Sequence, residues 1–301
     1  MATIGTVGLG EMGGAFVERL LDAGRTVIGW NRTRSKAEYL IKRGMRWGIS
    51  PADVAAQSDV VITMVTNAAA LDAVTTGADG ILGAIRGKIL VEMTTCAPAE
   101  VVRLATRVAE AGGELIDAAV LGSTLTIRQG KLVIMVAGGE AAIATVRPVL
   151  EDIGPRVVMM GETGKAKVMK IALNLNLAAQ MLALSEGLLL AVKSGIDRTK
   201  ALEVMLAGAI ASPMLQYRAP FIEEMPQKAW FDVGMMQKDC DLALALGKEL
   251  GIPLMATAVS REMLSAARGQ GLAERDFAIV YYALANAAGI HETVRLAEAV
   301  H

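Results

Sequence analysis

Residues 3–14 read Thr-Ile-Gly-Thr-Val-Gly-Leu-Gly-Glu-Met-Gly-Gly, and the architecture of the N-terminal half follows from this stretch. A short apolar run ends at Val7 and is followed at once by glycines spaced Gly-x-Gly-x-x-Gly, after which an amphipathic helical pattern begins. In a strand–turn–helix unit these glycines permit a tight turn, a close approach of pyrophosphate and a close packing of helix on strand. The N–H groups at the helix start attract phosphate. The stretch therefore predicts a dinucleotide site at Gly8, Leu9, Gly10, Glu11, Met12 and Gly13.

Outward from this turn, short apolar runs alternate with amphipathic segments as far as about residue 160. The predicted strands are Thr3–Val7, Thr26–Trp30, Val60–Met64, Ile89–Glu92, Glu114–Ala118, Leu132–Ala137 and Arg156–Met160. Strands separated by helices predict right-handed crossovers and a mainly parallel sheet, with the later strands extending it and an antiparallel pairing possible at the edge. The pattern predicts an α/β Rossmann-type N-terminal domain over residues 1–163.

The pattern changes after Gly164. Ala166–Lys193 is one long helical pattern without proline, and further helical segments follow near 199–207, 234–247, 256–268 and 276–287. Glycine and proline separate these segments. The sequence predicts an all-α C-terminal domain over residues 164–301, joined to the Rossmann-type domain by the long helix. So much aliphatic surface on few helices favours a homodimer or homotetramer.

Composition narrows the range of partners. A formal net charge of −1 gives no general field for nucleic acid or for an anionic membrane, so neither partner is expected. The most apolar stretch, Ile171–Val192, contains Asn174, Gln180 and Glu186, which favours a buried helix of a soluble protein over a membrane span. With only two cysteines and two histidines, His291 and His301, no metal site is expected, and a cytoplasmic location is predicted.

The end of the second predicted strand indicates which dinucleotide is bound. NAD-binding folds place an acid here, which pairs with the ribose 2′-OH and repels a 2′-phosphate. This chain instead has Asn31, followed by Arg32 and Thr33. Arg32 can present a planar fork to phosphate and Thr33 can add a donor, so NADP(H) is the predicted cofactor. The alternative interpretation is a basic first turn of a surface helix.

Three later segments carry a family resemblance. They read Asp117-Ala-Ala-Val-Leu-Gly-Ser123, Gly161-Glu-Thr-Gly-Lys-Ala-Lys-Val-Met-Lys170-Ile-Ala-Leu-Asn174 and Lys238-Asp239. Together with the glycine turn, in this order over nearly the whole chain, they resemble the β-hydroxyacid dehydrogenase family. Gly-Trp-Asn-Arg-Thr at Gly29–Thr33 is similar to its glyoxylate and succinic semialdehyde reductase branch.

The resemblance implies a role for several residues. Lys170 is implied as the catalytic residue, with Asn174 one helical turn later. Gly122, Ser123 and Lys238 are implied to bind substrate. The cofactor is implied to contact Met64, Val65 and Thr95, and Lys238 as well. The chain departs from the family pattern at Ala119 and at Leu121-Gly122, where Pro and Ser-Gly are usual, and at Lys165-Ala166, where a further glycine is common. These departures bear on substrate identity. For Arg128, a contact with a substrate anion and a surface role both stay open.

The chemistry agrees with these assignments. Hydride delivery to a carbonyl develops negative charge on oxygen, which needs a proton donor within about 3 Å, and a partly buried lysine can supply the proton. The alternative interpretation takes Lys170 as a solvated helix lysine, as Lys165 and Lys167 are expected to be. Two alternatives to an aldehyde-acid reductase remain, an imine reductase-like enzyme and a non-catalytic NADPH-binding protein.

Overall fold

The computed structural model describes residues 2–297 and divides into two compact units, Met1–Lys170 and Ile171–His301. The division falls within one long helix, α8 (Lys165–Lys193), which links the units. His301, the second of the two histidines, lies outside the described residues. The chain thus has a Rossmann-type unit and a helical unit, each of which is described by itself below.

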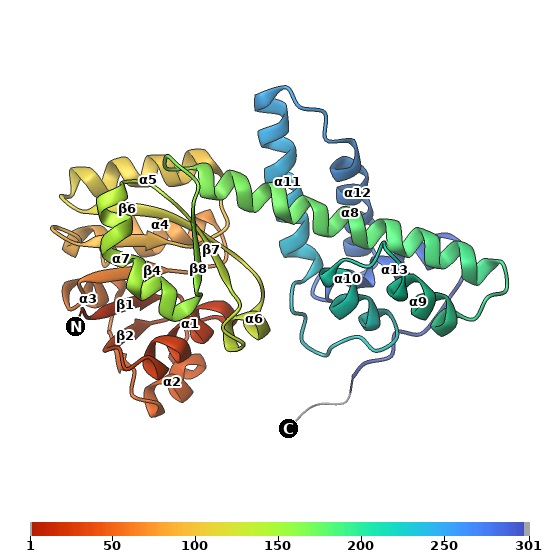
Figure 1. Ribbon diagram of the computed structural model, residues 1–301, viewed down its shortest axis with the longest axis horizontal. Coiled ribbons are helices and arrows are strands. Elements are labelled where there is room, and N and C mark those ends of the chain that lie inside the picture. Colours follow the sequence, from red (N-terminus) through yellow and green to blue (C-terminus); the bar gives the residue numbers. More distant parts are fainter. Residues whose placement is uncertain (1, 298–301) are drawn as a thin grey trace. The chain divides into compact units, whose positions relative to one another are not determined.

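The first unit is built on an eight-stranded sheet with the order β3-β2-β1-β4-β5-β6-β7-β8 (Figure 1). Its strands are β1 (Ile4–Val7), β2 (Val27–Trp30), β3 (Arg46–Trp47), β4 (Val60–Thr63), β5 (Ile89–Glu92), β6 (Glu114–Leu121), β7 (Val133–Ala137) and β8 (Arg156–Met159). All the pairings are parallel except β6 with β7, which is antiparallel. Each strand predicted from the sequence is present. The antiparallel pairing involves β7, the strand next to the edge strand β8, so it lies among the later strands, as the sequence allowed.

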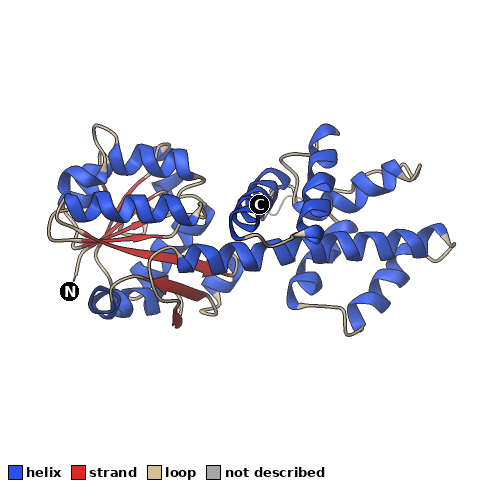
Figure 2. Cartoon of the chain, turned by 90° about the horizontal axis from the view of Figure 1, so that it is seen from above, coloured by secondary structure: helices blue, strands red, loops and turns tan. Residues whose placement is uncertain are grey.

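Helices cover both faces of this sheet, as Figure 2 shows. They are α1 (Glu11–Asp22), η1 (Arg34–Ala37), α2 (Glu38–Lys42), α3 (Pro51–Ala56), α4 (Ala68–Thr76), η2 (Ile81–Ala84), α5 (Pro98–Glu110), α6 (Thr124–Arg128) and α7 (Glu140–Ile153). One buried cluster joins α1, α2 and α7 to the sheet, and a second joins α3, α4 and α5 to it. Because strands buried on both faces read as continuous apolar runs, the sequence pattern located them well.

In its described part the second unit consists of helices and the loops between them, with two isolated β-bridges. It comprises most of α8 and then α9 (Arg198–Ala207), α10 (Pro213–Arg218), η3 (Ala219–Ile222), α11 (Val233–Leu250), α12 (Met255–Gly269), η4 (Phe277–Ile279) and α13 (Val280–Ala287). Its core gathers Met181, Leu184 and Leu188 of α8 around Phe277 and Tyr281.

Helix α8 is also long and apolar enough, by length and composition, to cross a membrane, with 39% of its most apolar window buried in the protein. The buried residues of that helix contribute to the core of the second unit, which accounts for part of its apolar character. The polar residues Asn174, Gln180 and Glu186 lie along the same helix, where hydrocarbon would make them costly.

Candidate active site

The glycine turn between β1 and α1 has the close contacts that its spacing predicts. Gly8 has φ +96°, in the region that favours glycine, and a Cβ there would lie 2.2 Å from the carbonyl oxygen of Met64. A Cβ at Gly13 would lie 1.9 Å from the carbonyl oxygen of Gly8, so helix and turn touch at this point. A Cβ at Gly10 would meet nothing within 4 Å. Gly10 thus leaves space in front of the start of α1, and a pyrophosphate fits this arrangement.

The residue that replaces the usual acid of β2 is tied to the glycine turn. The side-chain oxygen of Asn31 accepts a hydrogen bond from the N–H of Leu9 at 3.1 Å, and its amide nitrogen donates to the carbonyl of Thr33 at 3.0 Å. Arg32 and Thr33 follow as exposed residues. The structure thus brings the predicted 2′-phosphate residues next to the predicted pyrophosphate turn, with a neutral side chain between them.

The candidates for the nicotinamide end lie after the next strands of the sheet. Met64 and Val65 follow β4, and the N–H of Val65 donates to Oγ1 of Thr94 at 3.1 Å. Thr94 is buried, and Thr95 beside it is half-buried. Because neighbouring parallel strands end at the same edge, these residues share one edge of the sheet with the glycine turn.

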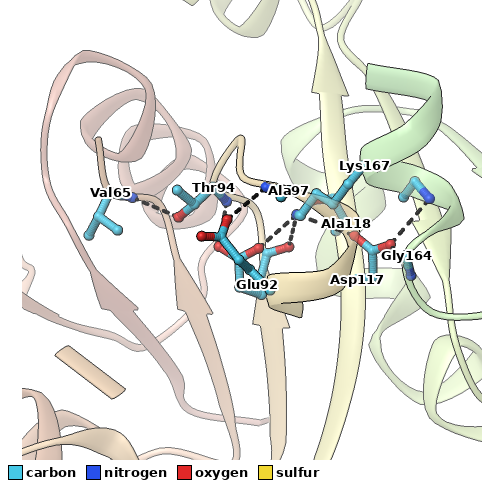
Figure 3. Close-up of polar contacts among 10 residues, drawn as sticks. Val65, Glu92, Thr94, Ala97, Asp117, Ala118, Gly164 and Lys167 are labelled. Carbon is cyan, nitrogen blue, oxygen red and sulfur yellow. Dashed lines mark hydrogen bonds and ion pairs between the residues drawn. The ribbon is translucent and has the colours of Figure 1, made fainter. Parts of the chain in front are cut away.

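The start of α8 contains a fully buried lysine (Figure 3). Lys167 is 0% exposed, and its Nζ lies 2.7 Å from Oε2 of Glu92 and 3.2 Å from Oδ1 of Asp117. Burial alone would lower the pKa of Lys167, but the two carboxylates outweigh burial and raise it. The expectation that Lys167 is a solvated helix lysine is therefore wrong. A sequence signal existed, since Glu92 and Asp117 are acids in two apolar strands.

Lys170 lies one turn further along α8 and is half-buried. It differs from Lys165, which is exposed, and from Lys167, which is fully buried. Asn174 follows one turn later on the same helix and is 3% exposed. Residues four apart lie on one face of a helix, so α8 presents Lys170 and Asn174 together, as the resemblance implies.

Asn174 and Lys238 are joined by a residue that sequence reasoning did not assign. The Asn174 amide nitrogen donates to Oδ2 of Asp239 at 2.5 Å, and Oδ1 of Asp239 lies 2.9 Å from Nζ of Lys238. Asp239 is 1% exposed. This contact fixes the orientation of the Asn174 amide, whose buried oxygen has no hydrogen-bond partner among the described residues. The Lys238-Asp239 pair in the motif was the available signal for Asp239.

The loop predicted to bind substrate makes a hydrogen bond within itself. Gly122 and Ser123 follow β6, but the N–H of Ser123 donates to Oγ1 of Thr126 at 2.7 Å, at the start of α6. That N–H is therefore occupied within the loop. Arg128 is 63% exposed in its side chain, and its Nε lies 3.5 Å from Oε2 of Glu18 on α1. This ion pair gives Arg128 a partner on the surface of the first unit.

The two cysteines are buried free thiols. Burial, with Glu92 beside Cys96 and Asp239 beside Cys240, raises the pKa of each thiol to about 12. Neither thiol is therefore suited to act as a nucleophile near neutral pH. Within residues 2–297 no cluster of His, Cys, Asp and Glu could hold a metal ion.

Comparisons with known proteins match both units. The NAD-binding domain of 6-phosphogluconate dehydrogenase matches residues 3–161, and the NAD-binding region of NADP-dependent 3-hydroxyisobutyrate dehydrogenase matches residues 164–284. Glyoxylate/succinic semialdehyde reductase 1 of Arabidopsis thaliana is 32% identical over 282 residues, which is 93% of this chain and 98% of that protein.

Two further matches agree with these. The 2-(hydroxymethyl)glutarate dehydrogenase of Eubacterium barkeri is 32% identical over 279 residues, covering 92% of this chain and 93% of that one. The crystal structure of a 3-hydroxyisobutyrate dehydrogenase from Salmonella typhimurium superposes with a TM-score of 0.86 at 25% identity, covering 93% of this chain and 99% of that one. Each of the proteins named here is a dehydrogenase or a reductase.

Proposed function

The chain belongs to the β-hydroxyacid dehydrogenase family, and from that premise we propose that it is an NADP(H)-dependent reductase of small aldehyde acids. Glyoxylate and succinic semialdehyde are the first substrates to consider, because they are named for a relative 32% identical to this chain. The observation that carries the proposal is the placement of half-buried Lys170 one helical turn before Asn174 on α8. The buried side-chain oxygen of Asn174 has no hydrogen-bond partner among the described residues. A lysine and an oriented amide in this arrangement suit a reacting carbonyl.

The cofactor would be held by residues of the first unit. The backbone of Gly8, Gly10 and the first turn of α1 would bind the pyrophosphate, and Arg32 with Thr33 would bind the 2′-phosphate. A reduced nicotinamide, when bound, supplies the hydride that reduces the carbonyl carbon. The residues of this chain then have to hold the carbonyl and provide a proton.

Lys170 supplies that proton. As the aldehyde carbon gains hydride, its oxygen gains negative charge, and the ammonium of Lys170 donates a proton to it, giving the hydroxy acid and a neutral amine. Solvent then reprotonates the amine. In the reverse direction the neutral amine removes the hydroxyl proton.

Asn174 orients the reacting groups. The amide nitrogen of Asn174 donates to Asp239, so its side-chain oxygen is the atom left to bind a reacting group. An amide oxygen accepts hydrogen bonds, and the donor would be either the Lys170 ammonium or the hydroxyl of the hydroxy acid. Lys238, paired with Asp239, adds a positive charge for the substrate carboxylate.

Replacing Arg32 tests the cofactor preference. We expect Arg32→Ala to weaken NADPH binding by about 10- to 100-fold, because a charge-assisted hydrogen bond to phosphate contributes about 1.5–3 kcal/mol. NADH binding should change by less than about threefold, since NADH lacks the 2′-phosphate. Dissociation constants for both dinucleotides, measured by titration calorimetry, give the comparison.

Arg43→Ala is the matched control for loss of a positive charge nearby. Arg43 follows the last residue of α2, and its guanidinium lies 2.7 Å from a carboxylate oxygen of Asp22, so its removal should leave both dissociation constants unchanged. An equal loss of NADPH and NADH affinity in Arg32→Ala would show that Arg32 does not recognise the 2′-phosphate.

A substrate panel tests the reaction. NADPH oxidation should be fast with one or more of glyoxylate, succinic semialdehyde and related aldehyde acids, and slower with NADH. If only a cyclic imine were reduced, the result would contradict the proposal and indicate an imine reductase-like enzyme instead. No turnover with any member would contradict the proposed reaction.

We also propose that the protein acts as a homodimer or homotetramer. Large apolar side chains of the second unit are exposed in the single chain, among them Leu190 at 72%, Val204 at 73% and Met255 at 75%. Exposed apolar surface of this kind is typical of surfaces that associate. The cytoplasmic location, which fits the two free thiols, stays a proposal as well.

A further inference from the structure

The proposed reaction does not use Lys167, the fully buried cation at the start of α8. Besides the two carboxylates, its Nζ donates to the carbonyl oxygens of Glu92 at 2.9 Å and Ala118 at 2.6 Å. Glu92 is the last residue of β5, and Ala118 lies in β6. A single ammonium on α8 is therefore bonded to two adjacent strands of the sheet (Figure 3).

The two carboxylates extend these contacts to other candidate segments. Oε1 of Glu92 accepts from the N–H of Thr94 at 2.6 Å, and Thr94 in turn accepts from the N–H of Val65. Oδ2 of Asp117 accepts from the N–H groups of Gly164 at 2.8 Å and of Ala166 at 3.2 Å, at the start of α8. The network thus connects the segments after β4 and β5 to the first turn of α8.

A gain in folding stability does not by itself explain why Lys167, Glu92 and Asp117 are buried together. Burying one cation with two anions removes three charges from water, and well-packed apolar residues often stabilise a fold as much or more. What the ionic group provides is a defined geometry, because an ammonium surrounded by four oxygen atoms allows little rotation or sliding of the helix. Lys170 is three residues further along, so the geometry of this first turn determines where Lys170 lies.

We propose that Lys167 is a positioning residue for the reaction. It fixes the rotation and depth of the first turn of α8 against the ends of β5 and β6, and it thereby places Lys170 relative to the segment that contains Thr95. This inference rests on the proposed function in one respect, the role of Lys170 as proton donor. Since the pKa of Lys167 is raised, the ammonium stays charged through the assay range and the contact is permanent.

The test compares three variants of the full chain. Lys167→Met keeps the length of the side chain and removes its charge. Lys167→Met with Glu92→Gln also removes one of the two carboxylates that would otherwise repel each other. Lys165→Met is the matched control, since Lys165 is an exposed lysine two residues earlier on α8. For each variant we would measure the melting temperature, kcat, KM, and the pH dependence with which an acylating reagent modifies Lys170, read by mass spectrometry.

We expect Lys167→Met to lower kcat by about 10- to 100-fold with KM changed less than threefold, because small misplacements of a catalytic group have effects of this size. The pH dependence of Lys170 modification should shift as well. The double variant should recover the melting temperature but neither kcat nor Lys170 modification. Lys165→Met should match wild type in every measurement.

Two results would overturn the proposal. A folded double variant with wild-type kcat and wild-type Lys170 modification would show that Lys167 only neutralises its carboxylates. Failure of both Lys167 variants to fold would give the residue a structural role alone. The modification of Lys170 needs no turnover, so it still reports on Lys167 if the substrate panel fails and the proposed reaction is rejected.

Discussion

Lys170→Ala is expected to lower kcat by roughly 10²- to 10⁴-fold, the usual contribution of a positioned proton donor. The alanine side chain cannot protonate the oxygen that gains charge during reduction. NADPH binding should be unchanged within about twofold, because the predicted pyrophosphate and 2′-phosphate residues are in the turn between β1 and α1, in the first turn of α1 and in the loop after β2. Steady-state kinetics with the best substrate of the panel, together with NADPH titration of the same preparation, measures both quantities.

Lys165→Ala provides the control for Lys170→Ala. It removes an exposed ammonium from the same helix, and kcat should stay within twofold of wild type. Activity of Lys170→Ala within tenfold of wild type would contradict the role of Lys170 as proton donor. Partial recovery of the alanine variant by a small primary amine added to the assay would support that role, because the amine can occupy the space of the missing side chain.

Alanine substitutions at Gly10 and Gly13 should affect different properties, NADPH affinity for Gly10→Ala and the stability of the fold for Gly13→Ala. A Cβ at Gly10 meets nothing within 4 Å, and the backbone there, with φ −74°, is open to any residue, so Gly10→Ala should melt at the wild-type temperature. The same Cβ occupies space that the pyrophosphate needs. We therefore expect NADPH affinity to fall by about tenfold or more, a loss of about 1.4 kcal/mol.

Gly13→Ala should instead destabilise the protein itself. Its Cβ would lie 1.9 Å from the carbonyl oxygen of Gly8, so α1 or the turn has to move, at a cost of about 1–3 kcal/mol. Thermal unfolding and NADPH titration of the two variants give the contrast. Unchanged NADPH affinity in a fully folded Gly10→Ala would contradict the assignment of this turn as the pyrophosphate site.

The main elements of the fold were predictable because the buried strands read as continuous apolar runs and the long helices have a regular pattern. Every predicted strand of the sheet is present, and the helix predicted over Ala166–Lys193 is α8. Short elements were missed. Strand β3 has two residues, too few for a periodic pattern, and helices α3 and α6 are only one or two turns long. After β2 the chain forms the 3₁₀ turn η1 before the short helix α2.

The geometry of the candidate site was predictable where it depends on local sequence, as in the close contacts of the glycine turn and in the placement of Lys170 and Asn174 on one helix. It was not predictable where function depends on which strands are neighbours. Lys165 and Lys167 look alike in a helical pattern, and only the pairing of β5 with β6 brings two carboxylates to Lys167. Asp239 was overlooked because its contact with Asn174 joins two helices and residues 65 positions apart.

The most direct test of the central claim follows the hydride itself. NADPH carrying deuterium at both C4 positions of the nicotinamide would be incubated with succinic semialdehyde and the protein, and the product examined by mass spectrometry and NMR. The account predicts one deuterium on the former aldehyde carbon of the hydroxy acid, formed by wild type and formed roughly 10²- to 10⁴-fold more slowly by Lys170→Ala. A protein that binds NADPH but transfers no deuterium to any aldehyde acid of the panel would contradict the account.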